Sequence, residues 1–157
     1  MSLHDYRFTD VWSVAAHRRS VFDALVDLLS WPLWWPDVRT VRKIDDDTAE
    51  ITCRAVLPYA LTIRLRRAEQ DHRAGRLRVD MTGDLDGYCE GVVRGSARGA
   101  RLAIDQRVEV TKPLLRALAP VARPLFTANH AMMMRRGERG LRTYLAPGVE
   151  HGPDVGA

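Results

Sequence analysis

His130 is the residue of this 157-residue chain best suited to chemistry. It shares one stripe of a helical pattern with Phe126, Met133 and Leu141, so a helix would turn the imidazole toward an apolar core. An imidazole titrates near neutral pH and can serve as general acid or base on a bound carbonyl compound. The same placement suits a core histidine held by one hydrogen bond, or a buried partner of Asn129, and the sequence leaves these roles open.

Two further polar residues, Asp10 and Gln106, occupy positions whose alternating neighbours are apolar. A polar side chain on a buried face needs a hydrogen-bond partner or a ligand, and the sequence does not decide between the two. Deep burial would raise the pKa of Asp10 and make it a candidate proton donor. Because no spacing places a Ser-His-Asp triad or a Cys-His pair, His130 is the catalytic candidate.

Metal and disulfide chemistry are not expected. Cys53 and Cys89 are the two cysteines, and neither a CxxC pair nor a group of histidines offers a zinc site. Residues 45–47 are three aspartates without the spacing of an EF-hand, so they are interpreted as a turn. Neither a signal peptide nor a membrane-spanning run is recognisable. We therefore expect a cytoplasmic protein with buried thiols, no metal, no cofactor and no integral membrane association.

The positive charge of the chain is concentrated in its C-terminal part. Lys and Arg number 24 against 20 Asp and Glu, which gives a formal charge of +4. Residues 113–145 hold six arginines against one glutamate, so the excess belongs to one amphipathic segment. RNP, zinc-finger and basic-zipper signatures are absent, and we expect no nucleic-acid partner. We interpret the arginines as a solvated helix face; a protein or membrane-surface contact through that face is the alternative.

Hydrophobic periodicity predicts the elements that must position these residues. Residues 6–14 alternate as a strand, and residues 17–29 repeat at three- and four-residue spacing as a helix. The prolines within residues 31–36 end that helix. Alternation then predicts strands at residues 38–44, 49–57, 59–65, 76–81 and 101–110, with a looser glycine-containing segment between residues 83 and 99.

The remainder of the chain is predicted to be helical. Over residues 113–145, Pro120 and Pro124 should divide a short first piece from a long second piece that begins at Pro124. Residues 1–5 are expected to be a flexible N-terminus, and residues 146–157 a disordered tail. A single domain would therefore span residues 6–145.

These elements predict an α+β domain in which a curved antiparallel sheet of about seven strands wraps a long C-terminal helix, with two short helices after the first strand. Every strand has one apolar face, and a single long helix is available to cover them. One helix does not fill a wide curved sheet. The space left between them predicts an internal cavity, which is the default candidate for a binding site.

The sequence resembles the START-like superfamily, also described as SRPBCC, polyketide cyclase/dehydrase or Bet v 1-like proteins, which has a helix-grip fold. The resemblance extends from about Tyr6 to Leu145. It rests on the following residues: Val21-Phe22, Ser30-Trp31-Pro32-Leu33-Trp34-Trp35-Pro36-Asp37-Val38, Gly83-Asp84-Leu85-Asp86-Gly87, Val110-Thr111-Lys112-Pro113, Pro124-Leu125-Phe126, Asn129-His130, Met134 and Gly140-Leu141. The superfamily includes lipid carriers, hormone receptors and cyclases, so the resemblance implies a fold rather than one chemistry.

The resemblance implies binding or transport of a small hydrophobic ligand, either lipid-like, aromatic or polyketide-like, in the internal cavity. It also implies an aromatic residue, usually Trp, where this chain has Gly91 and Gln106, and losing both would make the cavity wider and more polar. The alternative is a polyketide cyclase or aromatase that uses His130 as general acid or base. A homodimer is an assembly state that the sequence leaves open. The expected ligand-binding residues are Asp10, Trp35, Tyr59, Leu61, Met81, Tyr88, Cys89, Gln106, Phe126, His130 and Met133.

Overall fold

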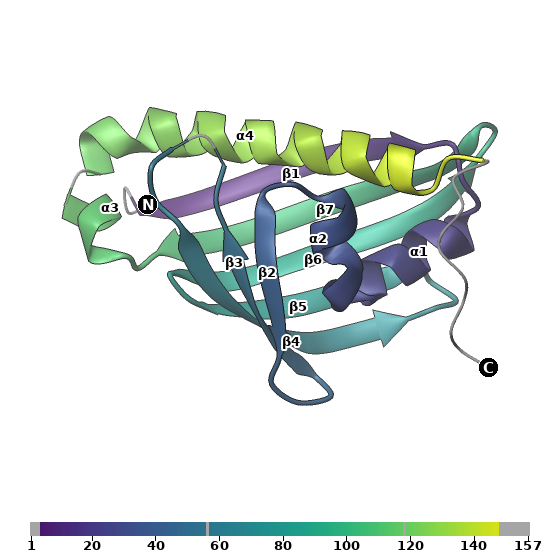
Figure 1. Cartoon of the computed structure of the whole chain (residues 1–157), viewed down its shortest axis with the longest axis horizontal. Coiled ribbons are helices and arrows are strands. Elements are labelled where there is room, and N and C mark those ends of the chain that lie inside the picture. Colours follow the sequence, from purple (N-terminus) through teal and green to yellow (C-terminus); the bar gives the residue numbers. More distant parts are fainter. Residues whose placement is uncertain (1–3, 56, 118, 148–157) are drawn as a thin grey trace.

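One antiparallel sheet of seven strands organises the chain, and all strands but the first follow one another as a meander (Figure 1). The computed structural model describes residues 4–55, 57–117 and 119–147. From one edge to the other, the sheet contains β1 (Asp5–Val14), β7 (Gly99–Val110), β6 (Leu85–Ser96), β5 (Arg76–Gly83), β4 (Leu61–Asp71), β3 (Thr48–Cys53) and β2 (Val38–Lys43). Short turns between alternating strands account for this antiparallel order.

Three short helical segments carry the chain from β1 across to the opposite edge of the sheet: α1 (Arg18–Val26), η1 (Leu28–Ser30) and α2 (Trp31–Trp34). After β7 come α3 (Pro113–Ala117) and the long α4 (Ala119–Tyr144), which runs along the sheet and closes the fold. The α+β helix-grip architecture expected from the sequence is thereby confirmed. The curved sheet, with one long helix against its concave face, is the frame of the candidate site.

Several element boundaries differ from the predicted ones. The long helix begins at Ala119, before Pro124, because Pro120 suits a first helical turn and α4 tolerates the one backbone hydrogen bond that Pro124 does not make. The predicted strand over residues 49–57 ends at Cys53. The next backbone N–H, that of Arg54, donates to the carbonyl of Asp37, which precedes β2. Tyr59 therefore precedes β4 instead of lying within a strand.

The predicted ends of the domain also change where the structure describes them. Asp5, expected in a flexible N-terminus, is the first residue of β1 and pairs with Glu109. The His4 carbonyl accepts a hydrogen bond from the Val110 N–H. Residues 1–3 and 148–157, the other parts of the two expected terminal segments, lie outside the described residues.

Strand alternation builds the core as the sequence predicts. In β4 the side chains of Leu61, Ile63 and Leu65 are buried, while the side chains between them are exposed. At two of its glycines, helix α4 packs directly against tryptophan residues. A Cβ atom on Gly137 would lie 2.7 Å from ring atoms of two tryptophans, and one on Gly140 would overlap the Trp34 carbonyl oxygen. The segment from Trp31 to Trp35 is therefore packed tightly against α4.

Candidate functional site

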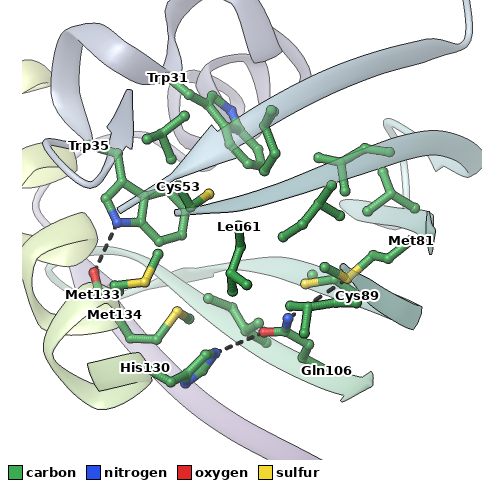
Figure 2. Close-up of a pocket in the computed structure, with 18 of the residues that line it drawn as sticks. Trp31, Trp35, Cys53, Leu61, Met81, Cys89, Gln106, His130, Met133 and Met134 are labelled. Carbon is green, nitrogen blue, oxygen red and sulfur yellow. Dashed lines mark hydrogen bonds between the residues drawn. The ribbon is translucent and has the colours of Figure 1, made fainter. Parts of the chain in front are cut away.

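A cavity of about 140 Å³ lies between the concave face of the sheet and α4 (Figure 2). Strands supply most of its wall, α4 supplies one side, and Trp31 and Trp35 close it near α2. Five of its lining residues carry sulfur: Cys53, Met81, Cys89, Met133 and Met134. None of the described lining residues is Asp, Glu, Lys or Arg. The site is therefore an apolar space with a small number of neutral polar groups in its wall.

His130 and Gln106 form the central polar contact of this wall. His130 Nε2 lies 2.9 Å from Gln106 Oε1, and Gln106 Nε2 points at Met81 Sδ, 3.7 Å away. An amide oxygen can only accept a hydrogen bond, so this contact requires the tautomer with hydrogen on Nε2 of His130. The two polar residues that the sequence singled out separately are thus brought together by the fold.

The environment of His130 keeps its imidazole uncharged. The ring stacks on Phe8, with centroids 3.6 Å apart and an interplanar angle of 12°. Burial lowers the pKa of His130 to about 4, because the charged imidazolium would lose its hydration. At neutral pH the side chain is a neutral hydrogen-bond donor. Its partner is Gln106, whereas Asn129 Oδ1 accepts from the Leu57 N–H at 3.4 Å.

The environment of the two cysteines in the cavity wall favours their protonated thiol form. Both are free thiols. Burial is the main cause that raises the pKa of Cys53 and of Cys89 to about 12, and nearby carboxylates add to it. Neither thiol is ionised near neutral pH, so neither is suited to act as a nucleophile.

Most of the expected ligand-binding residues line the cavity, and three do not. The lining residues are Trp35, Leu61, Met81, Cys89, Gln106, Phe126, His130 and Met133. Tyr88 follows strand alternation to the other face of β6, where Arg78 covers its ring at 4.2 Å and its hydroxyl donates to Asp105. Cys89 and Tyr88 are adjacent in a strand and therefore do not both face the cavity.

Asp10 and Tyr59 lie near the cavity without lining it. Asp10 is half-buried on β1, and burial together with the charge of Glu138 raises its pKa. Tyr59 packs against the core cluster from the segment before β4. Its hydroxyl is buried without a hydrogen-bond partner among the described residues, and burial raises its pKa. Asp10 is not among the lining residues and therefore does not contact the space in which a ligand would lie.

Sequence reasoning missed part of the wall contributed by α4 and α2. The helical spacing predicts that Met133 lies on the inward stripe, but Met134 is also buried and lines the cavity. Trp31 lines it as well. Trp35 lines the cavity, and its Nε1 donates to the Met133 carbonyl at 2.9 Å. The α4 stripe is wider than the sequence spacing indicates.

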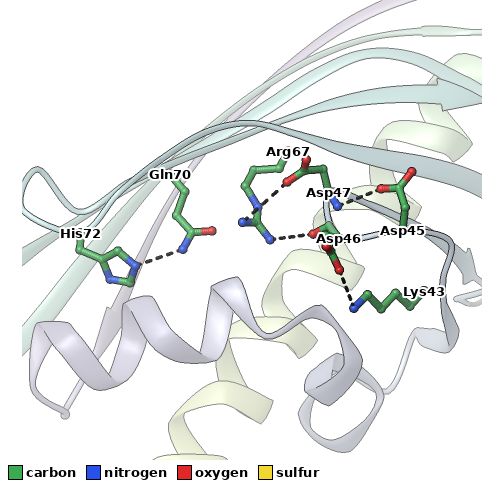
Figure 3. Close-up of polar contacts among 7 residues, drawn as sticks. All are labelled: Lys43, Asp45, Asp46, Asp47, Arg67, Gln70 and His72. Carbon is green, nitrogen blue, oxygen red and sulfur yellow. Dashed lines mark hydrogen bonds and ion pairs between the residues drawn. The ribbon is translucent and has the colours of Figure 1, made fainter.

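The aspartates at residues 45–47 form the turn between β2 and β3, as interpreted from the sequence (Figure 3). Lys43 Nζ lies 3.2 Å from a carboxylate oxygen of Asp46, and Arg67 pairs with Asp47 at 3.9 Å. Asp45 accepts from the Asp47 N–H at 2.9 Å. These carboxylates are thus occupied by local partners. Within the described part of the chain, no group of three or more His, Cys, Asp or Glu side chains is arranged to hold a metal ion.

Comparison with known proteins gives fold-level similarity. No model of a protein family matches the chain, and no curated protein matches its sequence. In the described part of the chain, no helix combines the length and hydropathy that crossing a membrane requires.

Solved structures are similar over most of the chain. The Zhui aromatase/cyclase from Streptomyces sp. R1128 has a TM-score of 0.76 at 13% identity, covering 97% of this chain and all of that one. A START superfamily protein from Mycobacterium smegmatis has a TM-score of 0.66 at 14% identity, covering 90% of this chain and 97% of that one. Ara h 8.0201 has a TM-score of 0.65 at 10% identity, with the same coverage. The chain therefore has the helix-grip fold found in START superfamily proteins, Ara h 8.0201 and an aromatase/cyclase.

Proposed function

We propose that the protein binds or transports a small hydrophobic molecule in the cavity between its sheet and α4. The observation that carries this proposal is a space of about 140 Å³ whose wall is apolar except for a small number of neutral groups. An apolar cavity of about 150 Å³ in another protein stays dry and binds benzene. Filling such a space with an apolar molecule restores dispersion contacts that its lining atoms lack.

The fold and the wall chemistry support a ligand that is lipid-like, aromatic or polyketide-like. Similar structures include a START superfamily protein and an aromatase/cyclase, and both keep the helix-grip architecture. Methionine side chains adapt their shape to varied apolar surfaces. Met81, Met133 and Met134 place this adaptable surface on both the sheet side and the helix side of the cavity.

Two glycines of β6 offer a matched test of the cavity. Gly91 lines it, whereas Gly95 is on the same face of the strand, is exposed and has no atom within 4 Å of an added Cβ. Gly91→Leu should fill the space and abolish the stabilisation that apolar ligands cause in a thermal-shift panel. Gly95→Leu should keep it. Native mass spectrometry after gentle purification should show a bound small molecule in the wild-type protein.

A wild-type protein with no bound molecule and no ligand-dependent thermal shift would overturn this proposal. Equal ligand responses in Gly91→Leu and Gly95→Leu would place the binding site elsewhere and would overturn it as well.

A cyclase-like enzyme is the second candidate, because His130 lies in the cavity wall and the aromatase/cyclase structure is similar over nearly the whole chain. Two observations favour binding instead. The pKa of about 4 leaves the imidazole a weak base, and its contact is to an amide rather than to a carboxylate. If the protein is an enzyme, His130→Ala should abolish turnover of a poly-ketone while ligand binding and folding persist.

We also propose that the protein forms a homodimer and is located in the cytoplasm. Light scattering during size-exclusion chromatography measures the mass of the assembly, and a monomer mass at all concentrations would overturn the dimer. Immunodetection in fractions of the native cell would test the location.

A further inference from the structure

Gln106 presents a hydrogen-bond donor that has only a weak acceptor. The residue is 9% exposed and lines the cavity. Its Nε2 lies 3.7 Å from Met81 Sδ, and a thioether sulfur accepts hydrogen bonds poorly. A buried donor gains free energy when a good acceptor replaces a poor one. An oxygen atom of a ligand beside Met81 would therefore be favoured.

The contact with His130 sets the orientation of this donor. Because Nε2–H of His130 donates to Gln106 Oε1 at 2.9 Å, the amide is held with its NH₂ group toward Met81 (Figure 2). Stacking on Phe8 holds the imidazole in turn. The donor is thus already oriented before a ligand binds, which reduces the entropy lost on binding.

The cavity wall excludes charged ligands. The lining residues within the described chain include no Asp, Glu, Lys or Arg, and Gln106 and Asn129 are neutral amides. Burial favours the neutral forms of His130 and of both thiols. A carboxylate or an ammonium group would be buried there without an opposite charge, which is strongly unfavourable.

The size and the lining of the cavity further restrict which ligands it can hold. The volume of about 140 Å³ is close to that of a cavity that holds one benzene molecule. Trp35 and Phe126 provide aromatic surfaces, and thioether groups of Met81, Met133 and Met134 approach from two sides. Aromatic rings make favourable contacts with thioether sulfur. A single aromatic ring suits this space.

We propose that the cavity selects a small, uncharged aromatic molecule with one hydrogen-bond acceptor, of the aryl ketone class, and that Gln106 Nε2 recognises the acceptor. His130 is a positioning residue in this scheme, because it acts through the amide. The inference rests on the proposed function, since it concerns the ligand of the same cavity.

Acetophenone and α-methylstyrene test this inference, because they differ only in a carbonyl oxygen against a methylene group. Their dissociation constants are measured by isothermal titration calorimetry on the full chain. Gln106→Leu should weaken acetophenone binding about tenfold relative to α-methylstyrene, since the carbonyl is then buried without a donor. Met81→Leu, a volume-conserving change that removes the competing sulfur, should strengthen acetophenone about threefold relative to α-methylstyrene. Benzoate should not bind.

The outcomes separate this inference from the proposed function. An unchanged ratio of the two constants in Gln106→Leu overturns the inference, while continued binding of α-methylstyrene keeps the proposed function. Binding of neither compound to the wild-type protein overturns both. If Gln106→Leu does not fold, the ratio in Met81→Leu decides, and no gain for acetophenone overturns the inference. Benzoate binding as tight as that of acetophenone also overturns it.

Discussion

Asp37 and Arg136, 99 residues apart in the sequence, form an ion pair with an N–O distance of 2.9 Å that ties the start of β2 to α4. The Asp37 side chain is fully buried, whereas that of Arg136 is 43% exposed. The second carboxylate oxygen of Asp37 has no hydrogen-bond partner among the described residues. The guanidinium of Arg136 therefore carries most of the compensation for burying this carboxylate. The Asp37 carbonyl also accepts from Arg54, so the same residue anchors the end of β3.

Arg136→Met should lower the free energy of unfolding by roughly 3 kcal/mol, because it leaves a buried carboxylate without its counter-ion. Urea denaturation followed by circular dichroism measures this. Arg135→Met is the matched control: Arg135 is exposed on the same helix and has no ion pair among the described residues, so its loss should change stability by less than about 0.5 kcal/mol. Equal effects of the two substitutions would contradict the structural role of the pair.

Gly140→Ala should destabilise the protein, although helix propensity alone predicts a gain of about 1 kcal/mol. The added Cβ would overlap the Trp34 carbonyl oxygen, and that atom belongs to the backbone of α2, which does not move away easily. Gly95→Ala adds a Cβ in open space and should be nearly neutral. Thermal denaturation of both variants decides between these effects. A higher melting temperature for Gly140→Ala would show that α4 does not pack this closely against α2.

The free energy of unfolding should decrease as the pH is lowered from 6.5 to 4, because of His130. Its pKa in the folded protein is about 4, below the ordinary value of 6.5, so in this range the unfolded chain binds a proton that the folded protein does not. The contribution amounts to at most roughly 3 kcal/mol. His130→Gln should remove this slope, and the difference between the two proteins separates His130 from Asp10, whose raised pKa acts in the opposite direction. Parallel pH profiles of the two proteins would disprove the assignment.

Cys53 and Cys89 should react with a thiol reagent at pH 8 about a thousandfold more slowly in the folded protein than an exposed cysteine, because their pKa of about 12 leaves little thiolate. Absorbance of released nitrothiobenzoate measures the rate. Thr127→Cys adds an exposed thiol on α4 and is the internal control. In denaturant all thiols should react at similar rates. Fast reaction of the native protein before unfolding would contradict the burial of the two thiols.

The sequence predicted most elements of the fold because their signals are local. In β4, Leu61, Ile63 and Leu65 alternate with exposed residues, and that pattern is visible over five positions. The resemblance also led to the helix-grip architecture. The predicted start of the long helix at Pro124 is wrong, because a residue that commonly begins or ends a helix is tolerated within α4. Tyr59 and Tyr88 do not line the cavity as predicted, because neither the exit from β3 nor the register of β6 can be determined from residue types.

By itself, the sequence determined the periodic faces of most strands and the central stripe of α4, and thus many of the side chains that are buried. It identified His130 and Gln106 as polar residues on such faces. Only the tertiary structure decided that His130 Nε2 meets Gln106 Oε1, that the amide donor points at Met81, and that Arg136 neutralises Asp37. Periodicity depends on residues a few positions apart, whereas these contacts depend on the strand register, the sheet curvature and the placement of α4, which the whole chain sets together.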